Sequence, residues 1–181
     1  MLSYQETECI FNTAEQIYSA EVVSETVKRM ALEITECLSE QYPLILSVMG
    51  GAVVFTGQLL PLLKFPLNFD YLHVSRYNTM YPGQVTWKVL PHEESLKGRV
   101  VLVLDDILDE GLTLAAIQER VMDCGADAFY SAVFADKKID KPKPIQANFV
   151  GVTLPDRYVF GFGMDVQSAW RNLPAIYAIK D

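Results

Sequence analysis

The chain has 181 residues, of which 50% are hydrophobic and 21% charged, a composition typical of a globular domain and not of a disordered or fibrous protein. The net charge is −8, with 15 Lys and Arg against 23 Asp and Glu. Because proteins that bind nucleic acids through their phosphates usually present a basic face, no nucleic acid partner is expected.

The sequence has none of the segments that indicate export or a membrane partner. Residues 1–19 are polar and acidic, so we expect no signal peptide, and no apolar run approaches the ~20 residues that a membrane span needs. Cys9, Cys37 and Cys124 are scattered and lack metal-binding spacing, which favours reduced thiols. The expected location is therefore cytoplasmic.

The first half of the chain alternates helical and strand patterns. One long helix is predicted by apolar residues at spacings of three and four, which are Val23, Val27, Met30, Ile34 and Leu38. The expected elements are, in order, a helix over 19–38, a buried strand over 44–49, a helix over 53–63, a strand over 67–73, a polar loop over 75–84 and a short strand over 86–90.

The second half continues the alternation. The apolar run over 99–104 predicts a central parallel strand that is buried on both faces. It is followed by a predicted helix over 113–124, closed by Gly125, and by strands over 129–135, 149–153 and 175–179. A local basic cluster falls in a proline-containing loop over 137–146. Together these elements predict one α/β domain over 1–181 with a twisted, mainly parallel sheet flanked by helices.

Unusual residues follow three of the predicted strands. They are Met49-Gly50-Gly51, Asp105-Asp106 and Asp136-Lys137. Ligands of open α/β sheets usually bind beyond the carboxyl ends of the strands, so the binding site is expected there.

The segment over 100–113, VVLVLDDILDEGLT, has the strongest chemical pattern in the sequence. Gly111 allows a sharp turn, Thr113 is expected to cap the following helix, and the free amides at a helix start suit a phosphate. Asp105 and Asp106 suit a polyol or Mg²⁺. The plainer alternative is that the acids only end a strand and the threonine only caps a helix. The order of strand, acids, turn and helix disfavours it.

This segment resembles the phosphoribosyl pyrophosphate (PRPP) signature of type I phosphoribosyltransferases. Four further stretches are similar to hypoxanthine-guanine phosphoribosyltransferases, namely 47–60, 70–77, 134–138 and 148–173. The resemblance covers the chain from about Leu44 onward. It implies the type I phosphoribosyltransferase fold with a small hood formed by terminal segments. The implied reaction is purine salvage, in which the phosphoribosyl group of PRPP moves to N9 of hypoxanthine or guanine and yields IMP or GMP and pyrophosphate.

The resemblance also implies roles for individual residues. Asp109 would be the catalytic acid-base group near purine N7. The residues that would bind PRPP or nucleotide are Asp105, Asp106, Ile107, Glu110, Gly111, Leu112 and Thr113. Purine contacts would come from Lys137, Tyr158 and Val159. Pyrophosphate contacts would come from Met49, Gly50, Gly51 and Arg171. Mg²⁺, the expected cofactor, would be held by Asp105, Asp106 and Asp165, and a lid would begin at Ser75, Arg76 and Tyr77.

Two features depart from the pattern of the similar family. Met49 is followed by Gly50-Gly51 where that family often has Lys-Gly or Asn-Gly. Without the lysine, backbone amides would contact pyrophosphate there, and the Met49–Gly50 bond is the candidate for a cis peptide. The lid sequence SRYNTMYPGQ is also atypical.

Other functions of this fold remain open at this point. One alternative is a PRPP-sensing regulator that binds nucleic acid, which the acidic charge disfavours. Another is a xanthine-preferring phosphoribosyltransferase. The expected partners are PRPP and a 6-oxopurine, with the protein forming a homodimer or homotetramer.

Overall fold

The computed structural model describes residues 2–76 and 85–180. Within them, a six-stranded sheet has the order β4-β3-β2-β5-β6-β7, in which every neighbouring pair is parallel except β3 with β4. The strands are β2 (Leu44–Met49), β3 (Asn68–Arg76), β4 (Val85–Val89), β5 (Val100–Leu108), β6 (Ala128–Lys137) and β7 (Phe149–Leu154). The predicted mainly parallel sheet is confirmed.

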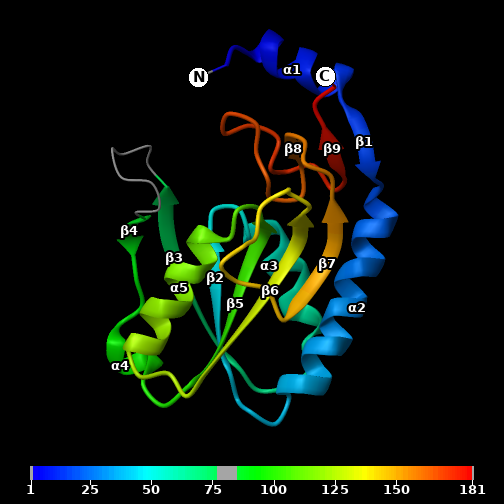
Figure 1. Cartoon of the computed structure of the whole chain (residues 1–181). Helices are drawn as coiled ribbons and strands as arrows, with labels where there is room; N and C mark the ends of the chain where they lie inside the picture. The colour runs from blue at the N-terminus through cyan, green and yellow to red at the C-terminus, as the bar shows by residue number, and fades with distance from the viewer. Residues whose placement is uncertain (1, 77–84, 181) are drawn as a thin grey trace.

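Helices cover both faces of this sheet (Figure 1). One face packs against α2 (Ala20–Leu38) and α3 (Val53–Leu59), and the other against α4 (Glu93–Leu96) and α5 (Leu112–Asp123). Alternate residues of β5 serve the two faces: Leu102 and Leu104 join the first core, and Val101 and Val103 join the second. A strand buried on both faces reads as an unbroken apolar run, as this one does.

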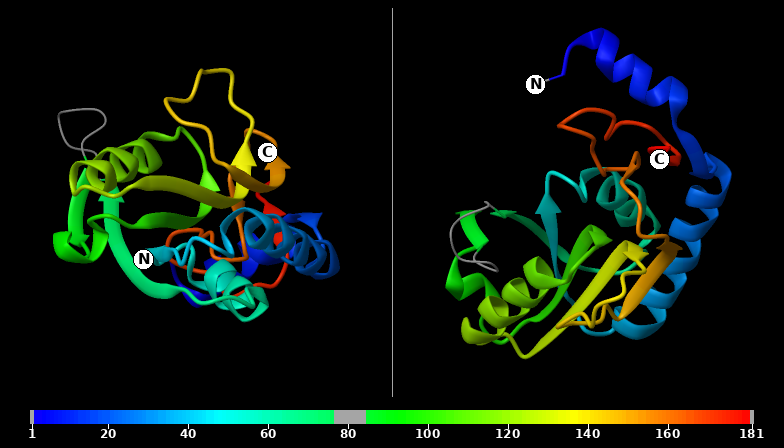
Figure 2. Two further views of the ribbon diagram at one scale, coloured as in Figure 1. Left: turned by 90° about the horizontal axis from the view of Figure 1, so that it is seen from below. Right: turned by 45° about the horizontal axis from the view of Figure 1, so that its top comes forward.

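A smaller sheet stands above the carboxyl ends of the parallel strands (Figures 1 and 2). Its order is β1-β9-β8, from β1 (Glu15–Tyr18), β9 (Ile176–Ala178) and β8 (Val159–Phe160). The helix α1 (Tyr4–Thr13) precedes it and packs Phe11 against Trp170, with ring centroids 5.0 Å apart. These terminal segments are the hood that the resemblance implied.

Several predicted elements differ from the observed ones. The helix expected over 53–63 ends at Leu59 and continues as a 3₁₀ turn, η1 (Leu60–Leu62), where Pro61 cannot donate a helical hydrogen bond. The strand predicted over 175–179 is in the hood and not in the main sheet. In the described parts of the chain, no helix is long and apolar enough to cross a membrane.

Candidate active site

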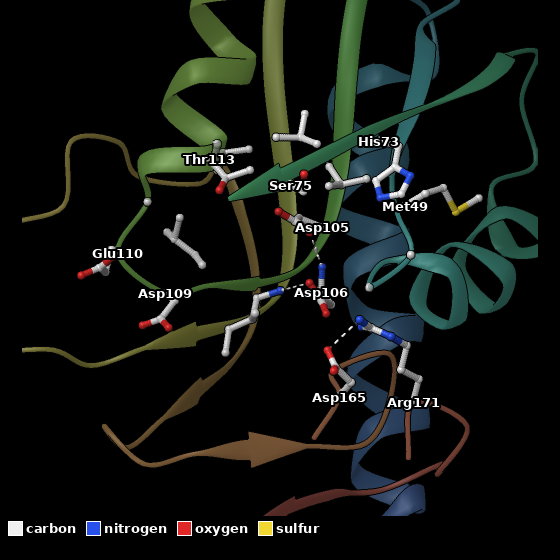
Figure 3. Close-up of a pocket in the computed structure, with 18 residues that line it drawn as sticks. Met49, His73, Ser75, Asp105, Asp106, Asp109, Glu110, Thr113, Asp165 and Arg171 are labelled. Carbon is white, nitrogen blue, oxygen red and sulfur yellow. Dashed lines mark hydrogen bonds and ion pairs between the residues drawn. The ribbon is translucent and has the colours of Figure 1, made fainter. Parts of the chain in front are cut away.

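A cavity of about 390 Å³ lies at the carboxyl ends of β2, β3 and β5 (Figure 3). All three groups of unusual strand-end residues were expected at this edge, and two of them, Met49–Gly51 and Asp105–Asp106, line this cavity. The β5–α5 turn contributes Asp109, Glu110, Gly111 and Thr113, whereas Leu112 is not part of the lining.

Asp105 and Asp106 lie inside β5, because this strand continues to Leu108 and does not stop at the acids. Asp105 is only 7% exposed. Burial, followed by the negative charge of Asp106, raises the pKa of Asp105 well above its ordinary value. Burial also raises the pKa of Asp106, while its hydrogen bond with Asp105 and the charge of Arg171 oppose this rise. The pair thus forms an acidic centre in which Asp105 is buried and Asp106 is partly exposed.

Close backbone packing surrounds the Asp106 carboxylate. A Cβ placed on Gly51 would lie 2.2 Å from Asp106 Oδ2, and one on Gly163 would lie 2.1 Å from the Gly51 carbonyl oxygen. At Gly163, where φ is 102° and the obstacle is backbone, only glycine allows this approach, whereas a Cβ on Gly51 would require the Asp106 carboxylate to move. The peptide bond between Met49 and Gly50 is cis, as predicted.

The β5–α5 turn differs from the prediction in its cap. Gly111 is the N-cap, with a φ of 81° and no side-chain cap hydrogen bond. Thr113, which was expected to cap α5, lies inside the first turn, because the helix already starts at Leu112. The Thr113 side chain faces the cavity (Figure 3), beside the first N–H groups of the helix, which have no acceptor within it.

A second cavity, of about 290 Å³, adjoins the first and shares Asp106, Ile107, Asp109 and Asp165 with it. Its other lining residues are Lys137, Tyr158, Val159 and Met164. Lys137 Nζ is 3.3 Å from Asp109 Oδ2, although the residues are 28 positions apart. Tyr158 is 53% exposed at the edge of this cavity. The structure thus brings together the residues to which the resemblance gave purine contacts.

The hood supplies the remaining charged groups. Arg171 forms an ion pair with Asp165 at 2.6 Å (Figure 3), and it donates to the Gly163 carbonyl oxygen. The Ser168 backbone N–H donates to the other Asp165 oxygen at 2.6 Å. Asp165 is therefore held by partners on both of its oxygens.

The residues expected to start a lid lie at and beyond the end of β3. Ser75 lines the first cavity, and its buried Oγ has no hydrogen-bond partner in the described portion of the chain. Arg76 is the last residue of β3. Tyr77 lies outside the described residues, as does most of the loop predicted over 75–84.

His73 also lines the first cavity and was not among the predicted site residues. It pairs in register with Met49 in the parallel β2–β3 ladder, which places it beside the Gly50-Gly51 turn. The available signal was its position at the end of the strand predicted over 67–73, since parallel strands end at one edge of the sheet.

Oxygen ligands for a cation are present, although they do not form a cage. Of the residues described, no three His, Cys, Asp or Glu side chains are grouped closely enough to hold an ion together. Mg²⁺ usually binds through one or two carboxylates plus substrate phosphates and water. The Asp105–Asp106 pair fits this mode, because a cation would relieve the repulsion between the two adjacent carboxylates.

Comparisons with known proteins agree with this geometry. The family model described as the phosphoribosyl transferase domain matches residues 13–169. A hypoxanthine-guanine phosphoribosyltransferase of Bacillus subtilis is 32% identical, with 91% of this chain and 92% of the relative aligned. A hypoxanthine-guanine-xanthine phosphoribosyltransferase of Tritrichomonas foetus is 29% identical, with 97% of each covered.

Solved structures lead to the same family. A hypoxanthine phosphoribosyltransferase from Staphylococcus aureus superimposes with a TM-score of 0.87 at 27% identity, covering 95% of each chain. The family match spans most of the chain, and the relatives align over nearly their whole length. The chain therefore belongs to the phosphoribosyl transferase domain family.

Proposed function

We propose that the protein is a purine salvage enzyme that transfers the phosphoribosyl group of PRPP to N9 of hypoxanthine or guanine. The observation that carries this proposal is the pair of adjoining cavities that share Asp106, Ile107, Asp109 and Asp165. In the first cavity, the carboxylates suit the ribose hydroxyls and a cation, and the N-terminus of α5 suits a phosphate. The other has a lysine and a tyrosine, as a flat oxo base requires.

PRPP occupies the first cavity in this proposal. Asp105 and Asp106 accept hydrogen bonds from the ribose hydroxyls, and the amides and hydroxyl of the Glu110–Thr113 turn hold the 5′-phosphate. The Met49–Gly51 turn and Arg171 contact the pyrophosphate, for which a guanidinium fork is well suited. Mg²⁺, held by Asp105 and Asp106 and at a second position by Asp165, would neutralise charge on the departing pyrophosphate.

Lys137 selects the base in the second cavity. An ammonium group has only donors, so it pairs with a 6-oxo group and disfavours the 6-amino group of adenine. Ile107 and Tyr158 pack on the faces of the ring, and Val159 offers backbone groups to its edge. Xanthine differs from hypoxanthine and guanine only at the 2-position, so its use depends on this edge.

The transfer itself breaks one bond and forms one. The bond between C1′ and the pyrophosphate oxygen breaks as purine N9 bonds to C1′ from the opposite face, and the electron pair leaves with pyrophosphate. Asp109 accepts the proton that the base loses at N7. The Asp109 carboxylate lies beside Lys137. If Lys137 donates to O6, this carboxylate is close to N7, which is the adjacent atom on the same edge of the purine.

A panel of bases tests the proposal. Purified protein is mixed with PRPP and Mg²⁺ and offered hypoxanthine, guanine, xanthine, adenine and uracil, and nucleotide formation is followed. We expect IMP and GMP, and no product once EDTA is added. PRPP binding without product from any base would instead favour the regulator that senses PRPP, and retention on RNA or DNA at low salt would support that alternative.

We expect the enzyme to be a homo-oligomer. Exposed apolar side chains occur on β3 and α3, where Phe69, Tyr71 and Val53 are between 43% and 46% exposed. Apolar surface of this kind is often covered by another subunit. Sedimentation equilibrium of the purified protein would measure the state, and a monomer at all concentrations would contradict the expectation.

A further inference from the structure

Lys143, in the loop between β6 and β7, is a buried cation that the proposed reaction does not use. Its side chain is 13% exposed. The ammonium donates to the Leu108 carbonyl at 2.7 Å, to the Lys137 carbonyl at 2.6 Å and to Asp136 Oδ1 at 2.6 Å. An ammonium has three N–H donors, and all three are engaged.

The acceptors of Lys143 lie where the central ladder ends. The last registered pair between β5 and β6 is Leu108 with Asp136, so the ladder does not reach the two residues that follow. Those residues are Asp109 and Lys137, which line the second cavity. Lys143 therefore connects the end of β5 to the end of β6 at the point where the pairing of these strands stops.

The loop that carries Lys143 also lies against the Glu110–Thr113 turn, which is called the phosphate turn below because it would hold the 5′-phosphate. A Cβ on Gly111 would lie 3.3 Å from Pro144 Cδ and 3.5 Å from Lys143 Cβ. Ile145 is buried in the core beneath α5, which anchors the loop. The Cβ of Lys143 thus lies beside Gly111, while its ammonium binds the ends of β5 and β6.

We propose that Lys143 is a positioning residue that holds Asp109 and Lys137 at the spacing required by the base. The inference rests on the proposed function, in which these two side chains contact purine N7 and O6. These atoms are neighbours on one edge of the base, so their protein partners must lie close together. In the structure they are 3.3 Å apart. A small displacement of positioned groups is enough to lower a rate by one or two powers of ten.

The substitution Lys143→Met tests this role, because Met keeps the stem near Gly111 and removes all three donors. We expect the KM for hypoxanthine and guanine to rise about tenfold and kcat to fall about tenfold. The KM for PRPP should stay within about twofold, since the packing against the phosphate turn remains. Lys141→Met, at an exposed position of the same loop, is the matched control and should match the wild type.

A double-mutant cycle distinguishes an effect of Lys143 on the position of Lys137 from a general loss of order in the site. If Lys143 acts through Lys137, then adding Lys143→Met to Lys137→Ala should raise the purine KM by much less than it does alone. Lys143→Arg keeps the charge and provides a second variant if the methionine protein does not fold. Its donors lie in one plane and not around a tetrahedral nitrogen, so poorer hydrogen-bond geometry and about a threefold rise in purine KM are expected.

The outcomes are distinct. If the wild type forms nucleotide and the folded Lys143 variants have an unchanged purine KM, the inference is overturned and the proposed function stays intact. Equal rises in the KM of PRPP and purine, or additive effects in the cycle, also overturn it. A wild type that forms no nucleotide from any base removes the proposed function itself.

Discussion

Asp109 differs from the other acids of the site in its surroundings. Asp105 is buried within β5, whereas the Asp109 side chain is 46% exposed and has Lys137 Nζ 3.3 Å away. It borders both cavities, so in the proposed function it would face the sugar phosphate and the base together. A carboxylate in this position can accept a proton from the base without giving up a role in binding PRPP.

Replacing Asp109 with Asn removes the proton acceptor at nearly unchanged volume. We expect kcat to fall by about 10²–10⁴, the usual contribution of general acid-base catalysis, with little change in the KM for PRPP. Steady-state rates with hypoxanthine and guanine would measure it. Asp140→Asn, at an exposed site in the following loop, is the control and should retain full activity. Unchanged turnover in Asp109→Asn would refute the role.

The site residues differ in how far the sequence could predict them. Asp105 to Thr113 form one continuous segment, so their proximity follows from the chain itself. The strand-end pattern placed Lys137 at the same edge of the sheet as Asp105 and Asp106, but its contact with Asp109 spans two strands and was not predicted. Lys143 gave no local signal, because its partners are backbone carbonyls whose positions depend on the register of β5 and β6.

At the scale of elements, apolar periodicity predicted the helices and strands whose side chains pack in the two hydrophobic cores. The helix α2 was predicted to within one residue because its buried face repeats every three or four positions. In contrast, α1 has no buried residue, and β1 and β8 are four and two residues long, so they have little apolar pattern. These elements form through pairing and packing with distant segments, such as β9 and Trp170.

The turn between β2 and α3 passes close to β5, because Gly51 in this turn lies against the Asp106 side chain. We expect Gly51→Ala to displace the Asp106 carboxylate, because the new Cβ would lie 2.2 Å from its Oδ2. The KM for PRPP should rise about tenfold or more, since positioned groups tolerate little displacement. Titration of PRPP at saturating hypoxanthine would measure this, and a normal KM for PRPP would show that the carboxylate can adjust.

Gly57→Ala provides the matched control. Gly57 lies within α3, and an added Cβ there meets no described atom within 4 Å. Alanine in a helix is more favourable than glycine by roughly 0.5–1 kcal/mol, so this variant should be slightly more stable and fully active.

At the scale of the whole molecule, the site is complete only when the hood is docked on the main sheet. Asp105 to Thr113 come from the β5–α5 segment, whereas Asp165 and Arg171 come from the hood. The hood is tied to β7 of the main sheet by a hydrogen bond from Tyr18 Oη to the Thr153 carbonyl at 2.9 Å, and an ion pair between Arg157 and Glu15 at 2.7 Å joins two segments within the hood. The cavity therefore combines side chains from the middle of the chain with two side chains from its C-terminal part.

The acidic centre under the hood should lower the stability of the ligand-free protein. A raised pKa means that folded Asp105 binds its proton more tightly than unfolded Asp105 does. This stabilising contribution is fully present below the unfolded pKa, near 3.9, and is lost as pH rises through the folded pKa. Each tenfold difference in proton affinity corresponds to about 1.4 kcal/mol.

Asp105→Asn should consequently make the free protein more stable at neutral pH. Asn stays neutral and can still accept the hydrogen bond that the Asp106 N–H donates to Asp105 Oδ1 at 3.0 Å. We expect its advantage in melting temperature to be small near pH 4 and to grow with pH. A gain of several degrees is expected near pH 8, since 1 kcal/mol corresponds to about 2–4 °C in a protein of this size.

Thermal unfolding of both proteins from pH 4 to 8, with exposed Asp127→Asn as control, would measure this difference. A constant difference across the pH range would contradict the assignment of a raised pKa to Asp105. The same Asn variant should lose most of its activity, because a neutral amide binds the ribose hydroxyls and Mg²⁺ less well than a carboxylate does. In the proposed function, the negative charge that destabilises the ligand-free fold is thus the charge that would bind PRPP and its cation.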